Sequence, residues 1–444
     1  MKMLVTESAT GKLTFAVRAL TIGLMAVSTL LACGQSVTPP GAAAPAAAPQ
    51  AAAHPDPNAA WQQDLQVLVD ALSDPKTGQL DFAKLYPPAT FDAAITNLKA
   101  QDLTKTSFGE VNLQLIQLIA SAHVSHNAVV PQGRPFAQLL PLEFYWYSDG
   151  LAVTSATPEY ADALGARVIK IGESTPDQLL PKLAPYIAYE NDSWLRSIAT
   201  QYLTESAFLR HLNLLGSDKR VAITLEKPGQ PSFTISVALP DDMPKLVSFR
   251  EALHVRTPFY LSNPSKYYWY QYLEDSKTFY IQYNRCENDP QQSFSDFTKQ
   301  VLAEVDSHSV SRIVLDLRLN GGGDSSILAP LKQGLETRHK AIGHLYVLIG
   351  PKTFSSAMMN ASDLHDHLTA TLVGEPTGDG MNTYGNVASV LLPNFRIRVM
   401  YTNKFFGNKN AAPSTPQPDI YAPRTLASDL AGRDPALEAA IAAP

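Results

Sequence analysis

The sequence is short of cysteine, of positive charge and of long apolar runs, and each shortage excludes a class of protein. Only two cysteines occur among 444 residues, so no disulfide framework can staple the chain. The formal net charge of −6 gives no basic footprint for nucleic acid, and we expect no nucleic-acid partner. An uncharged apolar run covers residues 19–32, which is too short for a transmembrane helix.

The N-terminus has the pattern of an export signal. Lys2, Lys12 and Arg18 precede the apolar run, which suits the h-region of a secretory signal. The run ends in Leu30-Leu31-Ala32-Cys33, which resembles the lipobox of bacterial lipoproteins, although a plain signal peptide would also fit. We therefore expect a lipoprotein signal peptide over residues 1–32 and a lipid anchor on Cys33. The protein would then be exported and face the periplasm from the outer membrane, or lie at the cell surface.

Residues 33–60 are nearly all Ala, Pro, Gln and small residues. Such a segment cannot bury enough apolar surface to fold, so it is predicted to be a flexible linker. The remainder, from Trp61 onward, is long enough for more than one domain, since 45% of the chain is hydrophobic.

Signatures of a phosphate, nucleotide or metal site are weak. A triplet of glycines, Gly321–Gly323, follows a strand-like run, but Asp324 stands where a phosphate-binding loop would have lysine. Asp363 and His367 would share a helix face, with no third ligand at a suitable spacing. A polar solvated face explains them more simply, so we expect neither a metal nor another cofactor.

The periodicity of the apolar residues predicts helices first, then strands, then an alternation of both. The first part, residues 61–147, is expected to be mainly helical. Residues 148–240 are expected to form a small domain of strands with helices over residues 178–187 and 194–215. Residues 245–444 alternate strand and helix, which favours an α/β core with its site at the carboxyl ends of the strands. The expected strands of the alternating part are 278–283, 312–317, 345–349 and 371–373, and its expected helices are 294–305, a segment reaching Leu335, and 355–368.

The most informative stretch is Leu345–Ala361. An apolar run broken by Gly350 and Pro351 is followed by apolar residues at helical spacing, so Ser355 lies where a strand gives way to a helix. The free N–H groups of a helix start stabilise an oxyanion that forms nearby. Ser355 is therefore a candidate nucleophile, and a helix cap is the simpler alternative. Cys286 is a second candidate nucleophile, with no evident group to lower its pKa.

The glycine triplet adds to this interpretation. Three glycines free the backbone to present N–H groups that a Cβ would obstruct. Beside Ser355, such a loop could donate an N–H to an oxyanion. A structural turn remains the alternative for the triplet considered alone.

The order of several motifs resembles that of the tail-specific (C-terminal-processing) serine proteases and the related tricorn-core proteases. The motifs are Val314–Gly323 (VLDLRLNGGG), Thr353–Ala357, Val373–Thr377, Pro418–Ile420 and, upstream, Leu118–Ser121 with His126. The resemblance implies a ClpP/crotonase-like α/β core with an N-terminal helical segment and an inserted PDZ-like domain. It implies a serine peptidase that cleaves peptide or protein substrates and needs no cofactor.

Carried over residue by residue, the resemblance makes Ser355 the nucleophile and the Ser356 N–H an oxyanion donor. Gly322 or Gly323 would supply the other donor. The branch with a Ser–Lys dyad has its lysine where Gly380 stands here, whereas the tricorn-like branch uses a histidine matched by His126. Imidazole titrates near neutrality and can take the serine proton directly.

Two departures from the family pattern concern the group that orients the base. Val124 and Asn127 flank His126 in place of the family's Asp and Thr, and the acidic residue expected shortly before Pro418 is missing. Glu375 or Asp379 could substitute for it, and Lys352 is a fallback base. These departures keep a second function open, that of a lipoprotein which binds peptides or a partner chain without efficient cleavage.

Overall fold

The computed structural model describes residues 56–73, 85–86, 88–131, 138–242, 244–338, 343–408 and 410–444. The predicted signal peptide, Cys33 and the linker up to residue 55 lie outside the described residues. Within them, no helix is both long enough and apolar enough to cross a membrane.

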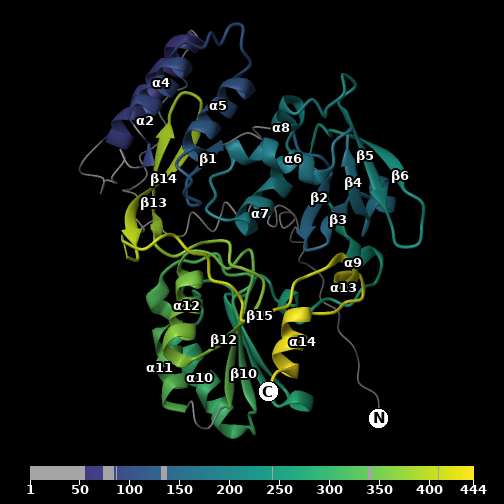
Figure 1. Ribbon diagram of the computed structural model, residues 1–444, viewed down its shortest axis with the longest axis vertical. Coiled ribbons are helices and arrows are strands. Elements are labelled where there is room, and N and C mark those ends of the chain that lie inside the picture. Colours follow the sequence, from purple (N-terminus) through teal and green to yellow (C-terminus); the bar gives the residue numbers. More distant parts are fainter. Residues whose placement is uncertain are drawn as a thin grey trace, which may run out of the picture.

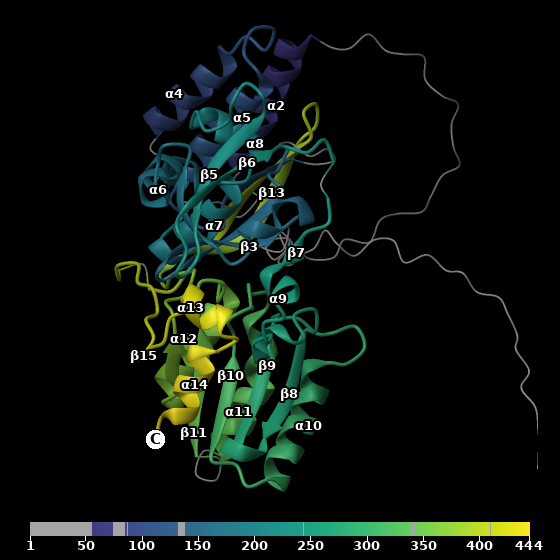
Figure 2. The same cartoon turned by 90° about the vertical axis from the view of Figure 1, so that its right-hand side faces the viewer.

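The lower lobe in Figure 1 is a sheet in the order β15-β12-β11-β10-β9-β8, in which only β8 is antiparallel to its neighbour. Its strands are β8 (Tyr268–Leu273), β9 (Thr278–Tyr283), β10 (Arg312–Asp316), β11 (His344–Ile349), β12 (Thr371–Gly374) and β15 (Ile420–Tyr421). Helices α10 (Phe294–Ser307), α11 (Ala329–Arg338) and α12 (Ser356–Leu368) lie along one face, and α14 (Pro435–Ala442) covers the other (Figures 1 and 2). The alternating pattern of the sequence therefore forms a mixed α/β lobe.

Strand β10 shows why these runs are almost wholly apolar. Ile313 and Leu315 pack in the cluster beneath α10–α12, while Val314 packs in the cluster beneath α14. Because both faces of the sheet are covered, both sets of side chains must be apolar. At the carboxyl end of β10, the buried Arg318 pairs with Asp316 and with Asp434, the N-cap of α14, at 2.6 Å each. That pairing ties the C-terminal helix to the sheet.

A second sheet, antiparallel and in the order β2-β3-β4-β5-β6, forms the right side of the upper lobe in Figure 1. Its strands are β2 (Leu142–Tyr147), β3 (Gly150–Ala156), β4 (Arg167–Ile171), β5 (Arg220–Glu226) and β6 (Phe233–Ala238), and its helices are α6 (Pro176–Leu183), α7 (Asp192–Tyr202) and α8 (Ser206–His211). The single helix expected over residues 194–215 is two helices, since the chain breaks at Leu203–Glu205. We call residues 142–238 the insert.

The left side of the upper lobe combines the N-terminal helices with a hairpin from the C-terminal third of the chain. Helices α2 (Pro57–Ser73), α4 (Pro88–Lys99) and α5 (Phe108–Ala120) pack on a sheet in the order β1-β14-β13. Strand β1 (Ala128–Pro131) follows α5, but β13 (Thr383–Leu392) and β14 (Ile397–Phe406) come from the C-terminal third. The expected N-terminal helices are present, and the long hairpin that reaches up to them was not predicted.

The remaining elements are short. They are β7 (Val247–Ser248), α9 (Phe249–Ala252), α13 (Leu426–Leu430) and the 3-10 turns η3 (Pro158–Ala163), η4 (Ala184–Tyr186), η5 (Phe259–Leu261), η6 (Glu274–Ser276) and η7 (Ser325–Leu328).

Candidate active site

Ser355 is the N-cap of α12 and has an unusual backbone conformation. Its φ of 51° and ψ of −126° put a non-glycine residue in the positive-φ region, and its side chain makes no capping hydrogen bond. Such strain costs about 1–3 kcal/mol and persists only where the surroundings enforce it. The simpler sequence interpretation, a serine that caps its helix through its hydroxyl, therefore does not describe this residue.

The loop before Ser355 is held by hydrogen bonds on both sides. Thr353 Oγ1 donates to Leu317 O and accepts from Gly350 N–H, each at 3.0 Å. The Phe354 N–H donates to Asn320 O, also at 3.0 Å. These bonds attach the strand–helix junction to the segment that follows β10, so the loop and the glycine triplet are fixed against each other.

His126 approaches this loop from the upper lobe, on the turn between α5 and β1. Its ring lies against the Phe354 ring with the centroids 4.6 Å apart, and the side chain is buried. The neighbouring Asn127 accepts a hydrogen bond from Thr402 N–H of β14 at 3.0 Å, which anchors the turn to the hairpin. His126, the base predicted from the sequence, thus contacts the residue next to Ser355, although it lies 229 residues before Ser355 in the chain.

Asp379 links the histidine to the serine. Its Oδ2 accepts the Ser355 N–H at 3.0 Å and lies 3.8 Å from His126 Nε2. Burial lowers the pKa of His126, and the negative charge of Asp379 opposes that shift. Both ring nitrogens of His126 lack a hydrogen-bond partner among the described residues. A neutral imidazole with a free nitrogen can accept a proton.

Two further residues complete the cluster. Ser125 Oγ lies 3.1 Å from Asp379 Oδ1 and 3.2 Å from Glu190 Oε2, so it bridges the two carboxyl groups. Thr383 donates its hydroxyl proton to Glu190 Oε1. Burial, and then the charge of Asp379, raise the pKa of Glu190 to about 9.

The glycine triplet lies directly against the nucleophile. A Cβ on Gly322 would come 2.7 Å from Ser355 Cβ and 3.1 Å from Ser356 N, so only glycine fits there. The Gly322 N–H donates to Asn320 Oδ1 at 2.9 Å, and Gly323 pairs with Cys286 in an isolated bridge. Ser356 occupies the first position of α12, where a backbone N–H has no intrahelical partner. Of the predicted oxyanion donors, Ser356 is therefore the one whose backbone N–H the helix leaves without an intrahelical partner.

The other candidate residues lie elsewhere. Glu375 is near Arg424 and Arg318; burial raises its pKa, and those two cations oppose the shift. Lys352 is exposed and has Arg424 and Glu143 as its charged neighbours. Cys286 is fully buried behind the glycine triplet, which leaves it no access to a substrate.

Within the described part of the chain, no group of three or more His, Cys, Asp or Glu side chains is arranged so that it could hold a metal ion. Asp363 instead pairs with Lys332 at 2.6 Å and lies 3.2 Å from His367 Nδ1.

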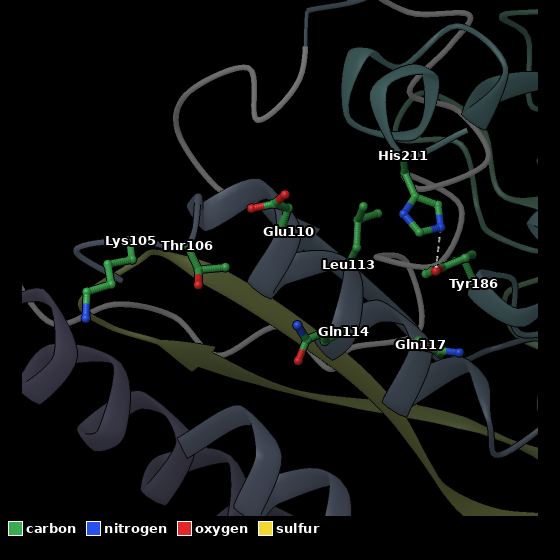
Figure 3. Close-up of a pocket in the computed structure, with 8 residues that line it drawn as sticks. All are labelled: Lys105, Thr106, Glu110, Leu113, Gln114, Gln117, Tyr186 and His211. Carbon is green, nitrogen blue, oxygen red and sulfur yellow. Dashed lines mark hydrogen bonds between the residues drawn. The ribbon is translucent and has the colours of Figure 1, made fainter. Parts of the chain in front are cut away.

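A pocket of about 430 Å³ opens between α5 and the insert, where the Tyr186 hydroxyl and His211 Nε2 are 2.8 Å apart (Figure 3). The pocket shares no lining residue with the Ser355 cluster.

Sequence reasoning proposed Ser355, His126 and, as one of two orienting acids, Asp379. It did not assign roles to Ser125 or Glu190. Ser125 stands beside His126 in the printed sequence, so its proximity was available as a signal. Glu190 carries no local signal, because only the docking of the insert brings it to Asp379.

No protein-family model matches the sequence, and no curated protein is detectably similar to it. Solved structures do resemble it. Mature CPAF complexed with lactacystin matches with a TM-score of 0.58 at 15% identity, covering 84% of this chain and 95% of that one. A second crystal structure of mature CPAF gives 0.55 at 15% identity, covering 84% and 94%. The photosystem II D1 C-terminal processing protease overlaps more loosely, with a TM-score of 0.40 at 13% identity, covering 81% and 92%. At such low identity the likeness concerns the fold alone: this chain shares the overall fold of CPAF.

Proposed function

We propose that this protein is a serine peptidase in which Ser355 attacks the peptide and His126 is the base. The observation that carries the proposal is the arrangement around Asp379, which accepts the N–H of the strained Ser355 while lying beside His126 Nε2. The order of the sequence motifs supports the same function, and the fold shared with CPAF is compatible with it.

In the proposed reaction these residues act in turn. His126 takes the proton of Ser355 Oγ as the oxygen bonds to the substrate carbonyl carbon, and the carbonyl oxygen becomes an oxyanion. The Ser356 N–H stabilises that charge, and the glycine triplet is the predicted source of a second donor. His126 then gives its proton to the leaving amine, and the C–N bond breaks. Water, deprotonated by His126, releases the acyl group and restores the serine. Asp379 stabilises the transient imidazolium.

We place the protein with the tail-specific and tricorn-core peptidases that lack the catalytic lysine. Gly380 stands at the lysine position, and Asp379, one residue earlier, takes up the orienting role for the histidine. The lower lobe would be the ClpP/crotonase-like core, and the insert would be the PDZ-like domain.

We further propose that the protein is exported and anchored through a lipid on Cys33, at the outer membrane facing the periplasm or at the cell surface. The carrying observation is the Leu-Ala-Cys sequence at the end of the apolar run. Expression of the full chain and of Cys33→Ala in a bacterium fed labelled palmitate tests it. Label in the parent and none in the variant would support the anchor, and an unlabelled parent would refute it.

The peptidase proposal is tested with a fluorophosphonate probe on the full chain in mild detergent. We expect labelling of the parent and of Ser362→Ala, a matched serine on the same helix, and no labelling of Ser355→Ala. His126→Ala should label far more slowly. Persistent labelling of Ser355→Ala would remove the nucleophile assignment.

The second candidate function is peptide binding without efficient cleavage. The absence of a hydrogen bond to either ring nitrogen of His126 within the described residues favours it, because an efficient base is usually oriented. Failure of the parent both to label and to cleave casein, together with saturable binding of unstructured peptides, would support this function over the first.

A further inference from the structure

We infer that Glu190 is a positioning residue for this site: it shares a proton with Asp379 and so leaves that pair a single negative charge next to His126. The inference deepens the proposed function and rests on it for its kinetic consequences. The shared proton itself can be observed without any catalysis.

If Glu190 and Asp379 were both ionised, the hydrogen bonds between them would be short of one proton. Ser125 Oγ is within 3.2 Å of both carboxyl groups and has one proton to donate. The other oxygen of Glu190 accepts from Thr383, and Asp379 also accepts from the backbone N–H groups of Ser355 and Gly380. Two buried carboxylates joined by one hydroxyl repel each other, whereas a proton on one of them adds a hydrogen-bond donor.

Asp379 is the member of the pair that should stay ionised. It receives two backbone N–H donors and a hydroxyl, and donors of this kind favour the charged form of a carboxyl group. Glu190 receives hydroxyl groups only. The proton therefore belongs on Glu190, in agreement with the pKa of about 9 that burial and Asp379 give it.

The charged groups around Glu190 are few. From the segment between β12 and β13 it faces Asp379, and His126 lies on the far side of Asp379, on the turn before β1. Ser125 and Thr383 are neutral, and Asp192, on the same segment as Glu190, is exposed. Within the described chain no lysine or arginine is paired with Glu190, so a proton is the group that can neutralise it.

The charge of the Glu190–Asp379 pair affects the imidazole of His126. With one charge, Asp379 keeps its bond to the Ser355 N–H and stabilises a protonated His126. When Glu190 ionises, the second charge repels Asp379 and disturbs the group that links histidine to serine. Because Glu190 belongs to the insert, the site has this carboxyl pair only when the insert is docked on the rest of the chain.

Three variants of the full chain test the inference. Glu190→Gln keeps the shape and a neutral donor, and Glu190→Leu keeps the approximate volume and removes all hydrogen bonding. Glu205→Gln is the matched control, since Glu205 is another desolvated glutamate of the insert, with its pKa raised to about 7 by burial. Thermal unfolding of each variant identifies those that fail to fold.

The first measurement is independent of activity. Infrared spectra at about pH 8, above the pKa of Glu205 and below that of Glu190, should show a protonated carboxyl band in the parent and in Glu205→Gln that disappears in Glu190→Gln. Its loss as the pH rises through about 9 should accompany a change in the His126 resonances followed by NMR. A parent without the band, or a band that Glu190→Gln retains, would overturn the inference whether or not the protein is a peptidase.

The second measurement is the rate of fluorophosphonate labelling as a function of pH. We expect the rate of the parent to fall above about pH 9 and that of Glu190→Gln to stay level there. Near neutral pH, Glu190→Gln should remain within about threefold of the parent and Glu190→Leu should lose about 10²-fold, the usual effect of misplacing a reacting group. An alkaline fall that persists in Glu190→Gln contradicts a positioning role. A parent that shows the infrared band but never labels would refute the peptidase proposal and leave the proton pair established.

Discussion

The indole ring of Trp194 stacks on the ring of Phe354, with the centroids 4.2 Å apart and the planes at 28°. Trp194 lies in the first turn of α7, in the insert, and Phe354 precedes the candidate nucleophile in the lower lobe. Phe354 also contacts the His126 ring. One phenylalanine therefore joins the insert, the histidine turn and the nucleophile loop.

Replacement of Trp194 with alanine should impair both stability and chemistry. Loss of a buried tryptophan costs about 3–5 kcal/mol of unfolding free energy. Because Phe354 then lacks one of its two ring partners, we expect the labelling rate of the folded protein to fall at least about tenfold as Ser355 is held less firmly. Urea unfolding and probe labelling measure the two effects.

The control for that prediction is Tyr202→Ala, which removes the stack of Tyr202 on Phe208 inside the insert, with ring centroids 3.9 Å apart. It should lower stability while leaving the labelling rate of the folded protein unchanged. Equal rate losses in the two variants would show that general destabilisation, and not the contact with Phe354, is responsible.

Asp379→Asn should separate the charge of Asp379 from its shape. An asparagine oxygen can still accept the Ser355 N–H, but the charge that supports a protonated His126 is gone. We expect the labelling rate to fall about 10³-fold or more, as for neutralisation of a triad acid. The NMR-determined pKa of His126 should fall further, since Asp379 is the group that raises it. Asp366→Asn, an exposed change on α12, should alter neither quantity; an unchanged rate in Asp379→Asn would reject Asp379 as the orienting acid.

Gly322→Ala tests the close approach of the glycine triplet to Ser355. The new methyl group would come 2.7 Å from Ser355 Cβ, a distance that forces one of the two segments to move. A displacement of about 1 Å at a reacting atom is enough for a loss of about 100-fold in labelling. Gly229→Ala is the matched control, because Gly229 also has a positive φ, of 74°, but open space around it. Similar losses in both variants would attribute the effect to backbone strain alone.

Much of the lower lobe was predictable because the patterns that specify its strands and turns lie among residues adjacent in the sequence. Val314 and Leu315 belong to a run that is apolar on both faces, and the glycine triplet marks its end. The hairpin β13–β14 was not predicted, since its burial depends on α2, α4 and α5, which lie about three hundred residues earlier. Helical periodicity through residues 194–215 also concealed the break at Thr204, whose carbonyl accepts the N–H of Leu140 at 2.8 Å.

The same distinction applies to the site. Ser355 was recognisable because a strand, a break and a helix are adjacent in the sequence. Asp379 could be named only as one of two acids, because the choice between it and Glu375 depends on which way a turn faces. The structure puts Asp379 beside His126 and Glu375 near Arg424. Glu190 could not be found, since its role depends on how one folded unit docks on another.

Below neutral pH, the labelling rate should follow the protonation of His126. Burial lowers its pKa below the ordinary 6.5, so the imidazole is neutral at pH 6.5 and the acidic limb of labelling should lie below that value. The unfolded chain binds this proton at higher pH than the folded chain does. The stability associated with a neutral His126 is therefore full above about pH 6.5 and is lost as the pH falls through the folded-state pKa. NMR titration of labelled histidine checks the direction, and a limb above pH 6.5 would contradict it.

Arg318→Met should destabilise the fold about as much as Trp194→Ala does, although it leaves the reacting residues in place. The guanidinium is buried between Asp316 and Asp434 and lies over the Tyr260 ring at 4.0 Å. Removal of the cation leaves the two buried carboxylates without the positive charge that neutralises them, which costs about 3–5 kcal/mol. Arg338→Met removes a more exposed pair with Asp306 and should cost less than about 1 kcal/mol. Urea unfolding of both variants measures the difference. If the two costs were equal, the Arg318 pairing would not be what holds α14 to the sheet. If the folded fraction of Arg318→Met also lost labelling, the pairing would affect the active site as well, through Leu317, whose carbonyl accepts a hydrogen bond from Thr353.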